Sequence, residues 1–437
     1  MEITRRALLG LSGAGAATGL LAGCAGQLPE PDTSRAGFGS GASGTIAVWT
    51  RSAVQTGMAG VVEAFHRAQD RIRVELTPVL DVQYVTKLAT SIRGGAPPDL
   101  VDVDDINSSL FIFRDAFTDL TDLVADLPYR ERLSPGHLAL ATQGRRVYGL
   151  PFLADNSLLW INTDLFERAK VDVDTATRDY DGLLDAAERV AGLGGDARGW
   201  SFPGNGPGAL GFTVQPFVWA AKTDLFRGPI GRQTPHIADN SALKRMLTLF
   251  RTMWRKDLVT PSSFSDQATA WGTEFLAGKV GVFPSNYFTV VSAAKKGFTD
   301  RLATVLIPGP DGGRSFFDGG DNLCIPRGAR NASAAWEFAR FALELQQQQR
   351  LPANGYTPVR ADANTDAFAK RYPFATAPLK QLDVGFAPKT LGYNLIYNQP
   401  GGPFLKMFRQ AVFGAGVDAA LDTGEAEYAR VLKAVQA

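Results

Sequence analysis

The chain has 437 residues, 45% of them hydrophobic and 20% charged, which is ordinary globular composition. This length favours two or more domains over one compact core. The 45 basic and 44 acidic residues give a net charge of +1 and no long run of one sign, which excludes an extended nucleic-acid-binding surface. Cys24 and Cys324 are the two cysteines, too few for a thiolate metal cluster. Because Cys24 belongs to a processing signal, we expect no intrachain disulfide, and Cys324 is expected to be a buried small side chain.

The amino terminus has the pattern of an export signal. Arg5 and Arg6 precede an uncharged, small and apolar stretch over residues 7–23, as in secretory signal peptides. The arginine pair resembles a twin-arginine signal, and the sequence Leu-Ala-Gly-Cys ending at Cys24 resembles a bacterial lipobox. This resemblance implies removal of residues 1–23 and lipidation of Cys24.

Residues 24–44 are rich in glycine, serine and proline, so they are predicted to form the lipid anchor and a flexible tether. The protein is therefore expected outside the cytoplasm, lipid-anchored to the outer face of the bacterial cytoplasmic membrane. An uncleaved membrane anchor is the alternative interpretation of the same segment.

Strand and helix patterns alternate along the first part of the folded chain. Short apolar or alternating runs predict strands, and apolar residues at helical spacing predict helices. The predicted order is strand 45–50, helix 58–69, strand 72–76, helix 82–93 and strand 98–103. Such alternation predicts a parallel α/β sheet with right-handed crossovers.

The pattern returns later in the chain. Residues 220–231 are expected to form a loop, and Asn331 is the expected N-cap of a helix. The further predicted elements are helix 242–256, strands 280–283 and 303–307, helix 332–345 and a carboxyl-terminal helix over 417–437. No repeat of fixed period is present, which excludes solenoids and propellers.

Six motifs, in order, resemble the extracellular solute-binding proteins of carbohydrate ABC importers, the maltose- and glycerophosphodiester-binding type. The motifs are Pro97–Val101, Gly144–Phe152, Leu159–Phe166, Phe275–Val282, Ala335–Phe338 and Gly355–Arg360. Two steps depart from the family pattern, Trp160-Ile161-Asn162 and Val280-Gly281-Val282. Residues 361–437 match only loosely.

The resemblance implies a fold of two α/β lobes joined by crossing strands, with the ligand in the cleft between them and closure about a hinge. Crossings are expected near 152–156, 307–310 and 351–355. Lobe one would comprise residues 45–153 and 308–350, and lobe two residues 154–307 and 351–437. The implied protein is a monomer and not an enzyme. It needs no cofactor or metal, and its partners are a carbohydrate and the transmembrane permease subunits of the importer.

A sugar cleft needs planar polar groups for the hydroxyls and aromatic rings for the apolar faces. Ligands in open α/β sheets bind beyond the strand ends. The polar candidates at such places are Arg51, Gln55, Asp104, Asp105, Asn107, Asp155, Asn156, Asn286, Gly319, Gly320, Asp321 and Asn322. Helix caps, plain turns and surface ion pairs are the competing interpretations.

The aromatic candidates rest on the resemblance: Tyr287 and Tyr356 lie in motif loops that face the cleft in the family, and the other three belong to lobe two. The five candidates are Trp219, Trp271, Tyr287, Tyr356 and Tyr393. By contrast, Trp200, Trp254 and Trp336 are expected to pack in cores or on surfaces.

The sequence contains few motifs of metal-binding or catalytic sites. The three histidines are widely separated, which argues against a zinc site, and no G-x-S-x-G elbow is present. A binding protein for a glycerophosphodiester or peptide, and a secreted glycosidase, remain alternatives. The acids Asp104, Asp105 and Asp155 make an amine-bearing sugar worth testing, because carboxylates repel anionic ligands.

Overall fold

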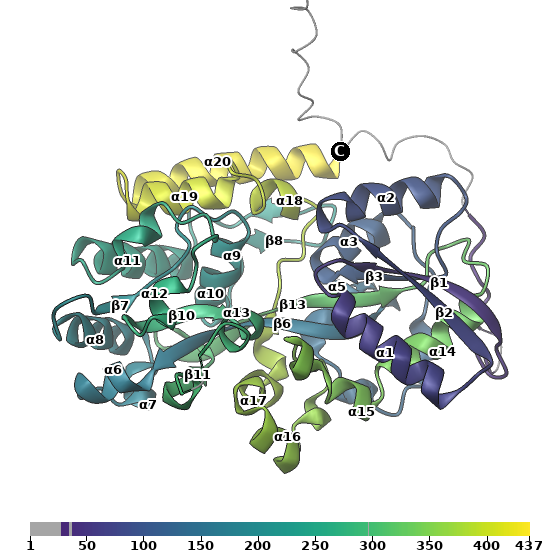
Figure 1. The fold of residues 1–437 in the computed structure, drawn as a ribbon. Coiled ribbons are helices and arrows are strands. Elements are labelled where there is room, and N and C mark those ends of the chain that lie inside the picture. The colour runs from purple at the N-terminus through teal and green to yellow at the C-terminus, as the bar shows by residue number, and fades with distance from the viewer. Residues whose placement is uncertain (1–27, 35–36, 296) are drawn as a thin grey trace, which may run out of the picture.

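A computed structural model describes residues 28–34, 37–295 and 297–437. The predicted signal peptide, Cys24 and the first tether residues lie outside the described residues. Two α/β bodies stand side by side, and the long strands β6 (Leu150–Asn162) and β13 (Gly312–Cys324) run between them (Figure 1).

Lobe one is built on three parallel strands in the order β2–β1–β3. Apolar side chains such as Ile46 and Val48 are fully buried in its core. The strands are β1 (Gly44–Arg51), β2 (Ile72–Val79) and β3 (Leu100–Asp104), and the covering helices are α1 (Gln55–Ala68), α2 (Asp81–Arg93), α3 (Asp105–Phe113), α4 (Thr121–Ala125), α5 (Pro135–Leu140), α14 (Ala332–Ala342) and α15 (Leu345–Gln348).

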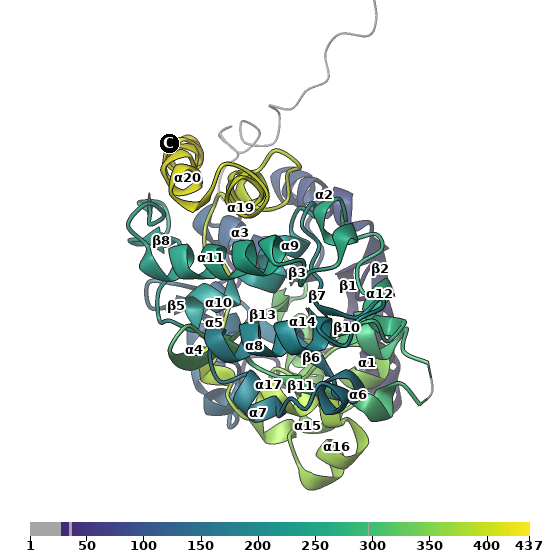
Figure 2. The ribbon, with the colours of Figure 1, turned by 90° about the vertical axis from the view of Figure 1, so that its left-hand side faces the viewer.

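Lobe two extends the sheet with β10 and β7, which are parallel to each other, and with β11, which pairs with β6. Its strands are β7 (Arg198–Trp200), β10 (Val280–Asn286), β11 (Leu302–Val305) and β12 (Ile307–Gly309), and its main helices are α6 (Thr163–Arg168), α8 (Tyr180–Ala191), α9 (Ala209–Val214), α10 (Pro216–Trp219), α11 (Ser241–Arg255), α13 (Tyr287–Val291), α19 (Pro403–Val412) and α20 (Val417–Gln436). The end of α20 lies at the top of the molecule, next to lobe one (Figure 1), while α10 and α5 lie on the side opposite α1 and α6 (Figure 2).

The first strands alone predicted a parallel sheet. The joining strands make the observed sheet mixed. β13 is antiparallel to both β3 and β6, and β10 is antiparallel to β6. The right-handed crossover rule describes connections between parallel strands, so it does not apply to these antiparallel pairs.

Buried apolar side chains show where the chain passes between lobes. Along β6 the core contacts change between Ala154 and Leu158, within the expected first crossing. Along β13 they change between Phe317 and Leu323. The predicted lobe limit at 307/308 therefore falls earlier than the passage. The limit at 350/351 also falls early, because Val359 still packs in lobe one.

Two local expectations are corrected. Asn331 makes no side-chain cap to α14; its side chain donates to the Ser43 carbonyl, and its backbone N–H donates to Asp99. Of the expected flexible tether, the described part packs on lobe one, because Glu30 pairs with Arg327 at 2.8 Å.

The aromatic core matches expectation. Trp200 and Trp336 are 0% and 3% exposed, and Cys324 is fully buried. In the part of the chain that the structure describes, no helix is long and apolar enough to cross a bilayer.

Candidate functional site

A cleft with a volume of about 610 Å³ lies between the strand ends of lobe one and the carboxyl-terminal segment. Lobe one contributes Arg51 and Asp104, the last residues of β1 and β3, together with Asp81 and Asn107 from the helices that follow β2 and β3. The opposite wall comes from α18 (Tyr393–Ile396), the residues beside it and the end of α20. Three parallel strands end at one edge of the sheet, so these polar side chains converge there.

Arg51 is the centre of a charged group that we call the Arg51 cluster: Arg51, Asp81, Asp104 and Asp321. The guanidinium lies 2.5 Å from Asp321, 3.0 Å from Asp81 and 3.6 Å from Asp104. Asp321 reaches it from β13, where its side chain is fully buried. One cation thus faces three carboxylates that come from both a lobe and a crossing strand.

The pKa values follow from this crowding. Burial would lower the pKa of Arg51, but Asp321 and Asp104 outweigh burial and raise it. Burial raises the pKa of Asp104 to about 6 despite the opposing effect of Arg51. Burial and the neighbouring Asp321 raise the pKa of Asp102, whose carboxyl accepts a 2.5 Å hydrogen bond from Thr50.

Asp155 and Asn286 form a second polar pair of the predicted set. The Asn286 amide donates to Asp155 at 3.1 Å, and its oxygen caps α13 by accepting from Thr289. Asp155 Oδ1 is buried and has no hydrogen-bond partner among the described residues. Burial raises the pKa of Asp155 to about 6. Tyr356 donates its hydroxyl to the Ala53 carbonyl at 2.6 Å, in the loop after β1.

Trp271 lies on lobe two, between two other rings. Its ring centroid is 6.5 Å from that of Phe212 and 5.7 Å from that of Phe283. Within the described residues, the buried Nε1 of Trp271 has no hydrogen-bond acceptor. The indole is thus held by packing and keeps a free donor.

Other predicted residues lie in a buried group at the lobe junction, the hinge cluster: Asp105, His137, Asn156, Asp318 and Thr357. The His137 nitrogens lie 3.4 Å from Asp105 and 3.4 Å from Asp318. Asn156 donates to Asp318 at 2.7 Å and accepts from Thr357. Because every member is at most 1% exposed, Asp105 and Asn156 serve the junction in this conformation and not the cleft surface.

Gly319, Gly320 and Asn322 lie inside β13, not in a loop before a strand. A side chain at Gly320 would come within 2.0 Å of the Leu153 carbonyl, and its φ is +149°. The glycine pair thus permits close approach of two crossing strands. Asn322 is fully buried and donates to Ser108.

The remaining candidates lie in other surroundings. Gln55 begins α1 and is exposed. Tyr287 is 4% exposed in the core, and Tyr393 stacks on Tyr397 at 4.9 Å. Trp219 lines a separate pocket.

Sequence reasoning missed much of the cleft lining, including the polar residues Asp81, Arg114, Asn394 and Asn398. Asp81 follows a predicted strand, so the rule that selected Asp104 would also have found it. The two asparagines lie where the family motifs match only loosely, and no local pattern marks them.

Comparison with known proteins agrees with this architecture. The family profile described as bacterial extracellular solute-binding protein matches residues 60–377. The diacetylchitobiose binding protein of Streptomyces coelicolor is 23% identical over 372 residues, which are 82% of this chain and 83% of that protein.

Solved structures show the same fold. The sugar-binding protein of Xanthomonas citri superposes with a TM-score of 0.78 at 20% identity, covering 89% of this chain and 98% of that one. The cyclic alpha-maltosyl-1,6-maltose binding protein of Arthrobacter globiformis gives 0.75 at 21% identity, covering 90% and 99%. These similarities confirm the predicted two-lobed α/β fold.

Proposed function

We propose, from the premise that this chain belongs to the family of bacterial extracellular solute-binding proteins, that it captures a sugar between its lobes for an ABC importer. The family binds solutes and does not transform them, so no turnover is expected. Delivery of the ligand to transmembrane permease subunits is the corresponding role.

The observation that carries the sugar proposal is the convergence of planar polar groups on one cleft. Arg51, Asp81, Asp104 and the amide of Asn107 lie on one wall, and the amides of Asn394 and Asn398 face them from the other. Carboxylates, amides and a guanidinium can exchange paired hydrogen bonds with adjacent hydroxyls. Asp155, Trp271 and Tyr356 are proposed to complete the site as the lobes close. A diacetylchitobiose or maltose type of ligand, as named for the relatives, fits this chemistry.

The glycerophosphodiester alternative fits less well. In the Arg51 cluster three carboxylates surround one guanidinium, and Arg51 is already paired with all three. A phosphate at this cluster would meet net negative charge, which disfavours an anion there, while Arg114 is a second arginine in the cleft lining.

A thermal-shift screen tests the proposal. The chain from residue 28, which keeps the Glu30–Arg327 pair, is heated with mono-, di- and amino sugars and with glycerophosphodiesters. A sugar present at 100 times its Kd should stabilise the fold by about 2.7 kcal/mol. The double variant Asp104→Ala/Asn107→Ala should lose this shift, while Glu188→Gln on the surface of α8 should keep it. A shift only with phosphodiesters would overturn the sugar assignment.

We propose more specifically that the bound sugar carries an amine. Because burial raises the pKa values of Asp104 and Asp155 to about 6, both are charged at pH 7.5 and largely neutral at pH 5. At low salt, calorimetric titration should show glucosamine-type ligands favoured over the parent sugar at pH 7.5, and this preference should shrink at pH 5. Equal affinities for the two sugars at pH 7.5 would contradict it.

Membrane attachment is proposed through Cys24 after export by the twin-arginine signal. Detergent phase partition of the protein expressed in a bacterial host checks this, because a lipidated protein enters the detergent phase. Cys24→Ser should remain in the aqueous phase, while Cys324→Ser should partition like the wild type.

A further inference from the structure

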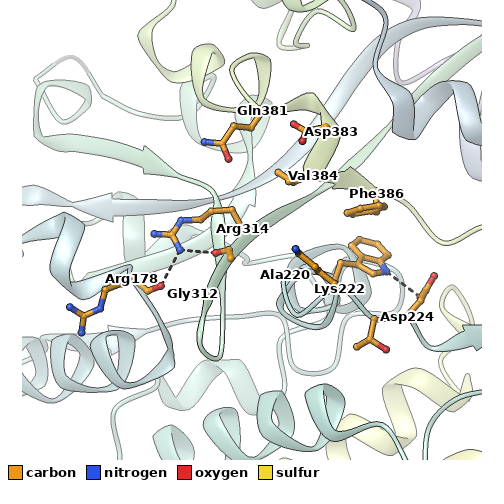
Figure 3. Close-up of a pocket in the computed structure, with 13 residues that line it drawn as sticks. Arg178, Ala220, Lys222, Asp224, Gly312, Arg314, Gln381, Asp383, Val384 and Phe386 are labelled. Carbon is orange, nitrogen blue, oxygen red and sulfur yellow. Dashed lines mark hydrogen bonds between the residues drawn. The ribbon is translucent and has the colours of Figure 1, made fainter.

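A second pocket, with a volume of about 1000 Å³, opens beside the turn between β12 and β13 (Figure 3). It shares no lining residue with the cleft of the Arg51 cluster. We call it the Trp219 pocket. The lining residues important for its chemistry are Trp219, Lys222, Asp224, Arg314 and Phe386.

One side of the Trp219 pocket is aromatic. Phe386 is 42% exposed, which is high for such a large apolar side chain. Its ring centroid lies 6.0 Å from that of Trp219 at an interplanar angle of 47°. Trp219 itself is held in place, because its Nε1 donates to Asp224 at 3.1 Å and its ring packs 5.6 Å from Phe317. The pocket thus offers a fixed apolar plate at the surface.

The other side carries two basic side chains, Arg314 and Lys222. Arg314 donates to the backbone carbonyls of Arg178 at 3.0 Å and Gly313 at 2.7 Å. These acceptors are neutral, and within the described residues neither Arg314 nor Lys222 forms an ion pair with a carboxylate within 4.0 Å. Burial lowers the pKa of Arg314, and the nearby charges of Asp179 and Asp174 oppose this effect without forming an ion pair with it.

The carboxylates of this wall do not cancel that charge. Asp224 is occupied by the Trp219 indole and by the Leu225 backbone N–H at 2.6 Å. Burial also raises its pKa. Asp383, beside Gln381, is the wall's other acid. Arg178, the third cation of the lining, pairs with Asp179, so Arg314 and Lys222 face one remaining carboxylate.

We infer that the Trp219 pocket is a second ligand site, for a small organic anion that carries a flat apolar ring. The anionic group pairs with Arg314 and Lys222, and the ring lies on Phe386. Guanidinium groups suit carboxylate geometry, and aromatic side chains bind flat apolar faces. An apolar pocket with a few convergent polar groups has the general form of a small-molecule site. This inference does not depend on the sugar assignment.

Two matched probes test it, 2-naphthoate and the neutral 2-naphthamide, titrated calorimetrically into the full chain. Naphthoate should bind about fivefold more tightly, because a solvent-accessible ion pair contributes modestly. Arg314→Gln and, separately, Lys222→Gln should each reduce that preference, and Phe386→Ala should weaken both probes. Lys222 is exposed, so its variant stays informative if Arg314→Gln perturbs the turn.

Two controls locate the binding. Arg189→Gln on α8 removes an exposed cation outside the pocket and should change nothing. Asp104→Ala alters the cleft and should also leave naphthoate affinity unchanged. The inference is overturned if wild-type protein binds the two probes equally or not at all, if Lys222→Gln and Arg314→Gln together keep the preference, or if Asp104→Ala abolishes naphthoate binding.

Discussion

Among single residues, Asp321 has the largest consequence for the Arg51 cluster. It is fully buried, and its Oδ1 lies 2.5 Å from Arg51. Asp321→Ala should lower the free energy of unfolding by about 3 kcal/mol, because it leaves a buried charge without its closest partner. Asp81→Ala removes a partner that is 37% exposed, and should cost less than about 1 kcal/mol. Urea denaturation measures the free energy of unfolding of both variants. Equal losses would contradict the larger contribution assigned to Asp321.

His137 gives the fold a pH dependence on the alkaline side. Burial would lower its pKa, but the carboxylates of Asp318 and Asp105 outweigh burial and raise the pKa to about 9 from 6.5. Below pH 6.5 the imidazole is charged in folded and unfolded chains, so the stabilisation is complete. Between pH 6.5 and 9 the unfolded chain loses the proton first, so stability falls as pH rises, by on the order of 3 kcal/mol in total.

Urea denaturation at pH 6, 7.5 and 9 measures this slope. His137→Gln should be less stable at pH 6 and should show a much flatter decline. Arg67→Gln, at an exposed position on α1, provides the control and should keep the wild-type slope. A wild-type protein equally stable at pH 6 and pH 9 would show that His137 is neutral in the fold.

Residue by residue, the sequence predicted the cleft better than the junction. Arg51, Asp104 and Asn107 follow strands, and the strand-end rule brings such residues together. Asp104 also caps α3 by accepting from Ile106, so the helix-cap interpretation is confirmed, while contact with a ligand stays a prediction. His137 gave no signal, because its partners Asp105 and Asp318 are far from it in sequence and only the fold assembles them.

At the scale of elements, periodicity predicted several helices and short strands of each lobe, while the crossing strand β13 was misread. In β13 the run from Gly319 to Asn322 has the composition of a turn. The structure uses it as strand because β6 and β3 pair with it on both sides. Tertiary pairing therefore overrides local turn propensity.

A substitution at Gly320 tests whether β13 and β6 require a glycine where they approach each other. Gly320→Ala places a methyl group within 2.0 Å of the Leu153 carbonyl on β6 at a φ of +149°. The strands must separate, so we expect a loss of about 3 kcal/mol or more in the free energy of unfolding. Gly278→Ala also has positive φ, +77°, but meets open space, and should cost about 1 kcal/mol. Similar losses in thermal or urea unfolding for the two variants would contradict the close-approach argument.

At the scale of the whole molecule, the order of the six motifs predicted the two-lobed fold, and hydrophobic periodicity did not. Hydrophobic patterns define each strand but not which strands cross between lobes. The opposite wall of the cleft illustrates the limit. Leu391, Asn394 and Ala437 reach lobe one only because the carboxyl-terminal helices fold back over the top of the molecule. Nothing local in the sequence marks these residues.

Closure about the junction is the expected response of the whole molecule to ligand. The cleft wall belongs partly to lobe one and partly to the carboxyl-terminal segment, so a ligand that contacts both walls favours the closed arrangement by its difference in affinity for the two states. X-ray scattering during titration with the sugar found by the screen should show a radius of gyration that decreases and saturates with the binding isotherm. Asn394→Ala/Asn398→Ala removes polar groups from one wall only, so it should weaken binding and shift the compaction to higher ligand concentration. Saturated binding without compaction would mean that the lobes are already closed in the free protein.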